Sequence, residues 1–158
     1  MTAAEYIDRY RLQPHPEGGW YREFYRSCRS LGRLSGYPGE RVALTVIYFL
    51  LEAGDFSAFH RVRGEEAWVF VAGDPLLVVL MDENPRFLTL GPPECSGEPL
   101  VIVPPGMLQG ARTLGEFTLV SCLVAPGFDF ADFTLPGRDE LLGAWPEYEA
   151  LVRSFTRG

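Results

Sequence analysis

Three observations in the sequence predict an all-β fold, a sandwich or barrel whose short helices are confined to its two ends. Short segments of β-type residues follow one another from residue 41 onward, and turn signals such as Gly73-Asp74-Pro75 separate them. Their close spacing favours a sandwich or barrel over βαβ units. Helical patterns occur only near the two ends. The eight predicted strands cover residues 42–51, 56–62, 66–72, 76–81, 86–90, 99–103, 108–112 and 116–124.

The first segment predicts a short helix, then a loop and a strand. Thr2 and Glu5 have the spacing of a capping box, and apolar residues follow on one helical face, so we expect a helix over residues 3–11. His15 lies between two prolines and is soon followed by two glycines, which predicts a loop. Bulky and charged residues mix over Trp20–Ser27, as in a half-exposed strand.

Three further segments complete the element prediction. Ser30–Glu40 is rich in glycine and polar residues, so we expect a surface loop there. Gly137–Trp145 and Pro146–Phe155 have the pattern of two short terminal helices. The second of them begins with a proline, which suits the first turn of a helix.

Composition limits the function classes. The 158 residues predict one domain, and a formal net charge of −7 argues against nucleic-acid binding, which needs clustered cations. All 14 cationic residues are arginine, which excludes Schiff-base chemistry on a lysine. The three cysteines have no paired spacing, and we find no signal peptide or stretch long enough to span a membrane. A cytoplasmic protein without a membrane partner is therefore expected.

The most informative pattern is a frame of glycines around a histidine and a carboxylate. It reads G-x5-H-x-V-x3-E-x6-G, with His60, Val62 and Glu66 between its two glycines. Metal-binding β-barrels of the cupin superfamily have a similar frame with a second histidine at the position of Val62. The related block P-x-G-x2-H occurs at residues 104–109, with Gln109 in place of its histidine. Since the chain holds only His15 and His60, one subunit cannot assemble a three-histidine metal site.

Strand alternation predicts which side chains share the barrel interior with His60. A turn at residues 63–65 would bring the face of Glu66 alongside His60, and Gln109 would begin a third inward row. The interior would then be mostly apolar and aromatic with a few polar groups, as small-molecule pockets are. The three predicted inward rows are Phe56, Ala58, His60 and Val62; Glu66, Trp68 and Phe70; and Gln109, Ala111 and Thr113.

Several stretches together resemble the cupin family of unknown function 985, also called cupin 5. The resemblance implies a double-stranded β-helix, or cupin jelly roll, over residues 1–158 and commonly a homodimer, but no settled reaction. Members often have histidine where this chain has Val69, which by alternation faces away from Glu66 and Trp68. The fold is also similar to that of sugar-nucleotide 3,5-epimerases. The matching stretches are residues 14–21, 58–62, 72–76, 109–112 and 125–133.

Three functions are compatible with these residues. The first is binding of a small polar or sugar-like molecule by His60, Glu66, Trp68 and Gln109, without a cofactor. The second is an epimerase or isomerase in which His60 is the catalytic base. Its opposing acid, and a further ligand-binding residue, would be Tyr48, a candidate by residue type only.

The third function is a metal-dependent enzyme, with a divalent metal on His60, Glu66 and Gln109. We disfavour it, because one imidazole, one carboxylate and one neutral amide make a weak ligand set for zinc or iron. In any of the three cases a partner subunit could close the pocket. It would do so with His15 or Glu17 of its N-terminal segment.

Overall fold

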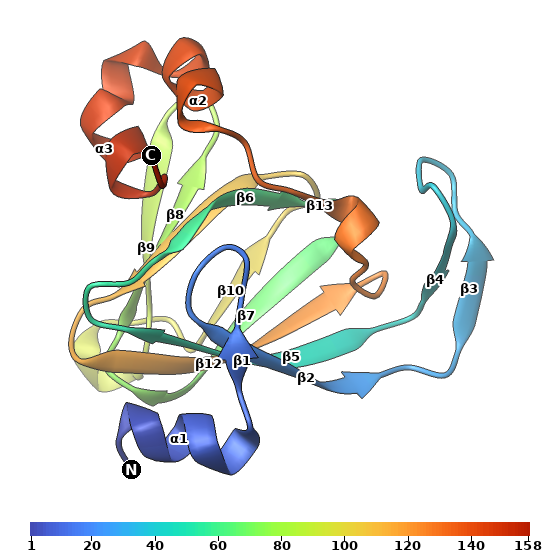
Figure 1. Ribbon diagram of the computed structural model, residues 1–158, viewed down its shortest axis with the longest axis horizontal. Helices are drawn as coiled ribbons and strands as arrows, with labels where there is room; N and C mark the ends of the chain where they lie inside the picture. Colours follow the sequence, from blue (N-terminus) through green and yellow to red (C-terminus); the bar gives the residue numbers. More distant parts are fainter.

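The computed structural model describes all residues 1–158, and Figure 1 shows two antiparallel sheets facing each other. The larger sheet has the strand order β1 (Gln13–Pro14), β2 (Trp20–Arg26), β5 (Thr45–Glu52), β12 (Phe117–Ala125), β7 (Glu65–Gly73) and β10 (Leu100–Val103). The smaller sheet has the order β13 (Phe133–Thr134), β6 (Ser57–Val62), β11 (Leu108–Thr113), β8 (Leu76–Met81) and β9 (Pro85–Leu90). A separate pair consists of β3 (Ser30–Arg33) and β4 (Glu40–Val42).

The chain crosses repeatedly between the two sheets. The successive strands β5, β6, β7 and β8 lie alternately in the larger and the smaller sheet. The late strands return to pair with early ones, so that β12 lies between β5 and β7, and β11 lies between β6 and β8. This order is that of an eight-stranded jelly roll. The predicted double-stranded β-helix is confirmed.

The main core fills the space between the sheets away from the open end. Its largest member, Trp68, is 1% exposed and packs edge-on against Phe49. Val78, Leu80 and Val120 surround this pair from both sheets. Full burial of each such side chain stabilises the fold by roughly 1.5–3 kcal/mol.

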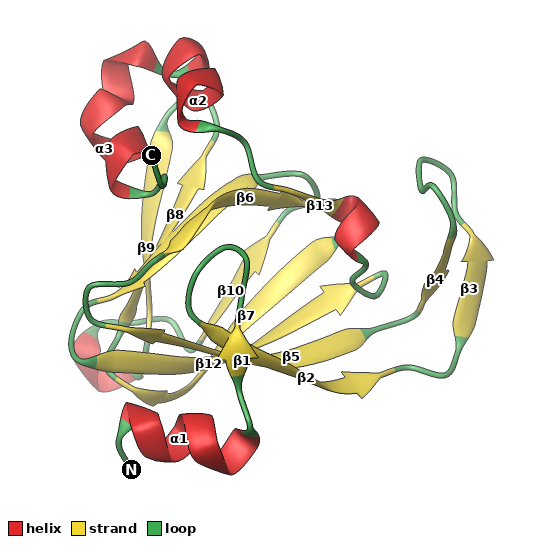
Figure 2. Ribbon diagram, viewed as in Figure 1, coloured by secondary structure: helices red, strands yellow, loops and turns green.

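Helices cover the outer faces of the barrel, as Figure 2 shows. α1 (Ala3–Tyr10) has the predicted capping box, and its apolar residues pack on Leu50 and Leu119 of the larger sheet. α2 (Arg138–Ala144) and α3 (Glu149–Ser154) cover the smaller sheet, where Phe59 contacts Phe155. Short 3-10 turns occupy Pro93–Cys95 (η1), Phe130–Asp132 (η2) and Pro146–Tyr148 (η3). No helix is long and apolar enough to cross a membrane.

Two predicted segments differ from the structure. Ser30–Glu40, predicted as a surface loop, contributes the two strands of an arm that extends from the barrel in Figure 1. The arm is held to the barrel by Arg41, whose Nε and Nη2 donate to the carboxylate of Asp132 over 2.7 and 2.8 Å. The predicted helix Pro146–Phe155 begins as a 3-10 turn and becomes α-helical only at Glu149.

One inward prediction is wrong because the strand is irregular. The pairing of β6 with β11 shifts between Ser57 and His60, which marks a bulge, and a bulge breaks the alternation of faces. Phe56 therefore points outward and packs against Phe155. The rows of Trp68 with Phe70 and of Gln109 with Ala111 do face the interior.

The homodimer, which light scattering would test, stays a prediction.

Candidate functional site

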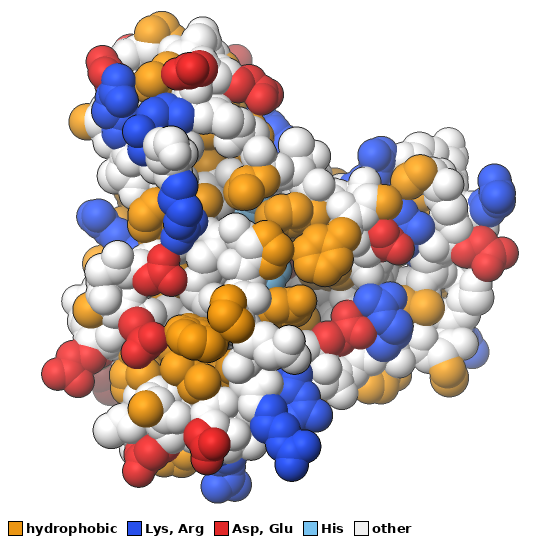
Figure 3. Space-filling model, in the orientation of Figure 1, with side chains coloured by type: hydrophobic (Ala, Val, Ile, Leu, Met, Phe, Trp, Pro, Cys, Tyr) orange, Lys and Arg blue, Asp and Glu red, His pale blue; other side chains and the backbone are white.

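A cavity of about 470 Å³ opens between the two sheets. Figure 3 shows histidine atoms at the bottom of a hollow bordered by hydrophobic atoms. Its polar lining comes from His15, Glu17, Glu23, Arg26, Thr45, His60, Glu66 and Asp129, and its aromatic lining from Tyr21, Phe49, Trp68, Phe128 and Phe130. Ile47, Val62, Cys122 and Val124 complete the wall.

His60 projects from β6 and is 1% exposed. Its Nδ1 lies 2.7 Å from the carbonyl oxygen of Ala58, which can only accept, so Nδ1 carries the proton. The lone pair of Nε2 is then free on the side of Glu17, whose Oε2 is 3.3 Å away. Burial lowers the pKa of His60, although the nearby Glu66 raises it. His60 is therefore a neutral acceptor near neutral pH.

Glu17 reaches the cavity from the loop between β1 and β2. The loop is tied to β6, because the carbonyl oxygen of Glu17 accepts from the backbone of Ala58 (2.7 Å) and from Arg157 Nη1 (2.6 Å). Gly18 follows with φ +110°, and a Cβ there would collide with the carbonyl oxygen of Phe56, so the tight turn needs glycine.

The carboxyl group of Glu17 is buried but not isolated. Ser57 Oγ donates to its Oε1 over 2.6 Å. Burial raises the pKa of Glu17 to about 8, against the opposing effects of Ser57 and Arg157. Glu17 is thus mostly protonated at neutral pH and offers a proton beside His60.

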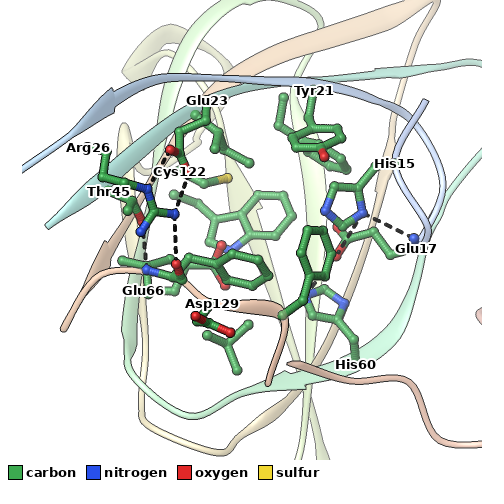
Figure 4. A pocket seen from close by; sticks show the side chains of 17 residues that line it. His15, Glu17, Tyr21, Glu23, Arg26, Thr45, His60, Glu66, Cys122 and Asp129 are labelled. Carbon is green, nitrogen blue, oxygen red and sulfur yellow. Dashed lines mark hydrogen bonds and ion pairs between the residues drawn. The ribbon is translucent and has the colours of Figure 1, made fainter. Parts of the chain in front are cut away.

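His15 lies on the other side of Glu17, as Figure 4 shows. Its Nδ1 accepts the backbone N–H of Glu17 over 3.1 Å, and its ring meets Tyr21 edge-on at 4.5 Å. Burial, together with the nearby His60, lowers the pKa of His15 to about 4. Both histidines are therefore uncharged at neutral pH.

Glu66 is held by a chain of hydrogen bonds from the barrel interior. Trp68 Nε1 donates to Gln109 Oε1 over 2.9 Å, and Gln109 Nε2 donates to Glu66 Oε2 over 2.7 Å. Burial raises the pKa of Glu66 to about 7, although His60 lowers it. Glu66 and Trp68 line the cavity, whereas Gln109 lies beneath them and fixes their orientation. Gln109 is absent from the cavity lining, and its contact with a ligand stays a prediction.

Tyr48 does not face the cavity. Ile47 and Phe49, its neighbours on β5, line the cavity, so strand alternation turns Tyr48 to the outer face. There its ring stacks on Tyr10 and Phe24, each at 4.4 Å. Tyr48 is thus remote from the cavity lining, and its role as an opposing acid or a ligand-binding residue stays a prediction.

The sequence prediction missed part of the cavity lining. Tyr21 and Glu23 alternate on one face of β2, a signal that was present in the predicted strand. Arg26 Nε and Nη2 form two 2.8 Å bonds to the carboxylate of Glu23, and Nη2 also donates to the carbonyl oxygen of Phe128. His15 and Glu17 line the cavity of their own chain. The sequence instead led us to assign these two residues to closure of the pocket by a partner subunit.

The side chains do not form a cluster of three or more His, Cys, Asp or Glu groups arranged to hold a metal ion. The arrangement instead collects four titratable side chains, His15, Glu17, His60 and Glu66, around one cavity. Burial is the largest cause of the pKa shift of each of the four, and it favours the uncharged form in every case. Such displaced groups mark candidate binding and proton-transfer sites.

Restoring the missing histidine should create metal affinity. Val62 lines the cavity on the same strand as His60, so Val62→His would add a second imidazole near His60 and Glu66. We expect Zn²⁺ to bind at least about tenfold more tightly, which corresponds to about 1.4 kcal/mol. Calorimetric zinc titration measures this, with Val69→His on the opposite face of β7 as control. Stoichiometric metal in the unmodified protein that is lost on His60→Ala would contradict this account.

Two solved structures are similar to the chain over its full length. The first is a hypothetical protein from Leishmania major, which is 32% identical with a TM-score of 0.91 and full coverage of both chains. The second is a protein from Shewanella oneidensis, 34% identical with a TM-score of 0.88, covering 99% of this chain and 98% of that one. A search of curated proteins gave no match.

More distant structures share the fold. An oxalate decarboxylase from Bacillus subtilis has a TM-score of 0.57 at 13% identity, over 90% of this chain and 36% of that one. The family model Cupin_5, described as "Cupin superfamily (DUF985)", matches residues 4–136. This match spans most of the chain and includes every residue that lines the cavity. The chain therefore belongs to the DUF985 family of the cupin superfamily.

Proposed function

We propose that the protein binds a small polar, sugar-like molecule in the cavity between its sheets. The observation that carries this proposal is that three buried polar side chains, His60, Glu17 and Glu66, face one cavity with aromatic walls. Buried polar groups are costly unless they are paired. Groups that keep unused hydrogen-bonding capacity toward a cavity suit a ligand that supplies the missing partners.

Each residue would make a different contact. His60 Nε2 would accept a hydroxyl proton, and the protonated carboxyl of Glu17 would donate one. Glu66 would bind through Oε1, since Oε2 already accepts from Gln109. Trp68 would provide an apolar face for the carbon skeleton of the ligand.

The substitution His60→Gln tests this function. Glutamine keeps polarity in the cavity but changes the position of the accepting atom, so ligand retention should fall while the melting temperature changes little. Native mass spectrometry of the purified protein would report a retained small molecule, and thermal melting would report stability. A variant that melts much earlier yet keeps its full ligand would show that His60 is only a core residue.

A second function is favoured by one distance. The 3.3 Å separation of His60 Nε2 from Glu17 Oε2 places a neutral base beside a carboxyl group whose pKa is about 8. Such a pair suits proton transfer in an isomerase or epimerase. In that case His60→Gln would leave binding intact and reduce turnover by roughly 10²–10⁴-fold, without any requirement for metal.

A further inference from the structure

The charged groups of the cavity are mostly acidic. Four carboxyl side chains line it, from Glu17, Glu23, Glu66 and Asp129, against a single guanidinium, that of Arg26. Arg26 is already engaged by both oxygens of Glu23 and by the carbonyl of Phe128. A bound anion would therefore find no free cationic partner in the lining.

Glu66 keeps one oxygen for a ligand. It is 7% exposed, its Oε2 accepts from Gln109, and the thiol of Cys122 is the other side-chain group of the protein that hydrogen-bonds the carboxyl. The exposed remainder of this side chain lines the cavity. An ionised carboxylate in such a place needs a positive charge nearby to offset its lost hydration. The protein provides no positively charged side chain beside Glu66.

Aromatic faces complete the environment. Tyr21, Phe49, Trp68, Phe128 and Phe130 all line the cavity, and Trp68 lies two residues from Glu66 on the same face of β7. Aromatic rings attract cations through their faces, and aromatic cages recognise ammonium groups in this way. Neutral polar ligands can hydrogen-bond to the carboxyl groups, but only a cation also offsets their negative charge.

We propose that the ligand of this cavity is a small organic cation, an amine or quaternary ammonium compound, held between the carboxylate of Glu66 and the aromatic walls. This rests on the proposed function, since it assumes that the cavity binds a small molecule. It adds that the molecule carries a positive nitrogen.

Cation binding would be coupled to proton release. Glu66 has a pKa of about 7 and Glu17 one of about 8, and both must ionise to attract a cation fully. Burial lowers the pKa of His15 and His60 and raises the pKa of the Cys122 thiol, so these three groups stay uncharged in this range. The affinity for a permanent cation should therefore increase as pH rises from 6 to 8.5.

Two probes of the same shape test the charge requirement. Choline carries a trimethylammonium group, and 3,3-dimethyl-1-butanol replaces it with a neutral tert-butyl group. Calorimetry would measure both affinities at pH 6 and pH 8.5, and the backbone amide shifts of Glu66 and Trp68 would locate binding. We expect choline to bind at least about tenfold more tightly at pH 8.5, with a smaller preference at pH 6.

The variant Glu66→Gln should remove this preference. The control Glu65→Gln makes the same charge change on the next residue of β7, which is exposed, and should keep it. If Glu66→Gln does not fold, the cation proposal is tested by the change of choline affinity between pH 6 and pH 8.5 in the unmodified protein.

Equal or tighter binding of the neutral probe would overturn the cation proposal and leave the binding function standing. A preference retained in Glu66→Gln would likewise overturn it. Failure of both probes to shift Glu66 and Trp68 would overturn the cation proposal, whereas the binding function would still be decided by ligand retention in His60→Gln.

Discussion

Replacing Trp68 with alanine is expected to destabilise the protein by about 3–5 kcal/mol, the usual cost of removing a large aromatic side chain from a core. Trp68 is 1% exposed and packs against Phe49 in the main cluster between the sheets. The change would also deprive Gln109 of its hydrogen-bond donor, and Gln109 in turn orients Glu66. The variant should therefore lose both stability and the fixed orientation of Glu66 in the cavity.

Urea unfolding of Trp68→Ala and two companions would measure this effect. Trp68→Phe keeps most of the ring and removes only the donor, so its cost should be about 1–2 kcal/mol. Phe87→Ala is a matched control, because Phe87 is an aromatic residue of the smaller sheet that is 57% exposed, and its removal should cost less than about 0.5 kcal/mol. A Trp68→Ala protein as stable as Phe87→Ala would show that Trp68 does not stabilise the core.

The sequence predicts most of the strands because their signals are local. Alternation and turn residues define β5 to β12 within a few residues, and the capping box of Thr2 and Glu5 defines α1. The arm formed by β3 and β4 has the composition of a loop, and it becomes a strand pair only through contacts such as that of Arg41 with Asp132, 91 residues away. Propensity cannot reveal such distant pairing.

The candidate site was predicted in part for the same reason. His60, Glu66 and Trp68 lie on strands whose facing could be derived by alternation, and all three line the cavity. His15 and Glu17 lie in a loop whose position depends on hydrogen bonds to Ala58 and Arg157, which a sequence does not display. Tyr48 is different, because alternation with Phe49 places it outside, and only its residue type had suggested a role.

The stability of the protein is expected to fall as pH rises from about 6.5 to 8.5. Glu17 and Glu66 have pKa values of about 8 and about 7, above the ordinary value of 4.5. The folded state therefore holds protons that the unfolded chain has already released in this range, and stability decreases with pH wherever the folded state binds more protons. Each such proton is worth about 1.4 kcal/mol per pH unit, so we expect a total loss of about 3 kcal/mol.

The histidines act in the opposite direction, but at lower pH. Burial lowers the pKa of His15 to about 4 and also lowers that of His60, so the stability they contribute is present above about 6.5 and is lost as pH falls. Between pH 4.5 and 6.5 these effects oppose the carboxyl effects. Above about 6.5 only the two carboxyl groups titrate among the residues with displaced pKa values near the cavity, since the Cys122 thiol stays protonated.

Isosteric amides separate the two contributions. Glu66→Gln should flatten the decrease near pH 7, and Glu17→Gln should flatten it near pH 8, because an amide stays neutral at every pH. Glu65→Gln removes a neighbouring exposed carboxylate and should leave the slope unchanged. Melting temperatures measured by circular dichroism at half-unit steps of pH would give these slopes. Stability that increases over this range, or a slope that both cavity variants retain, would mean that Glu17 and Glu66 are ionised in the folded protein. The cavity would then be open to water and already hold two negative charges before any cation binds.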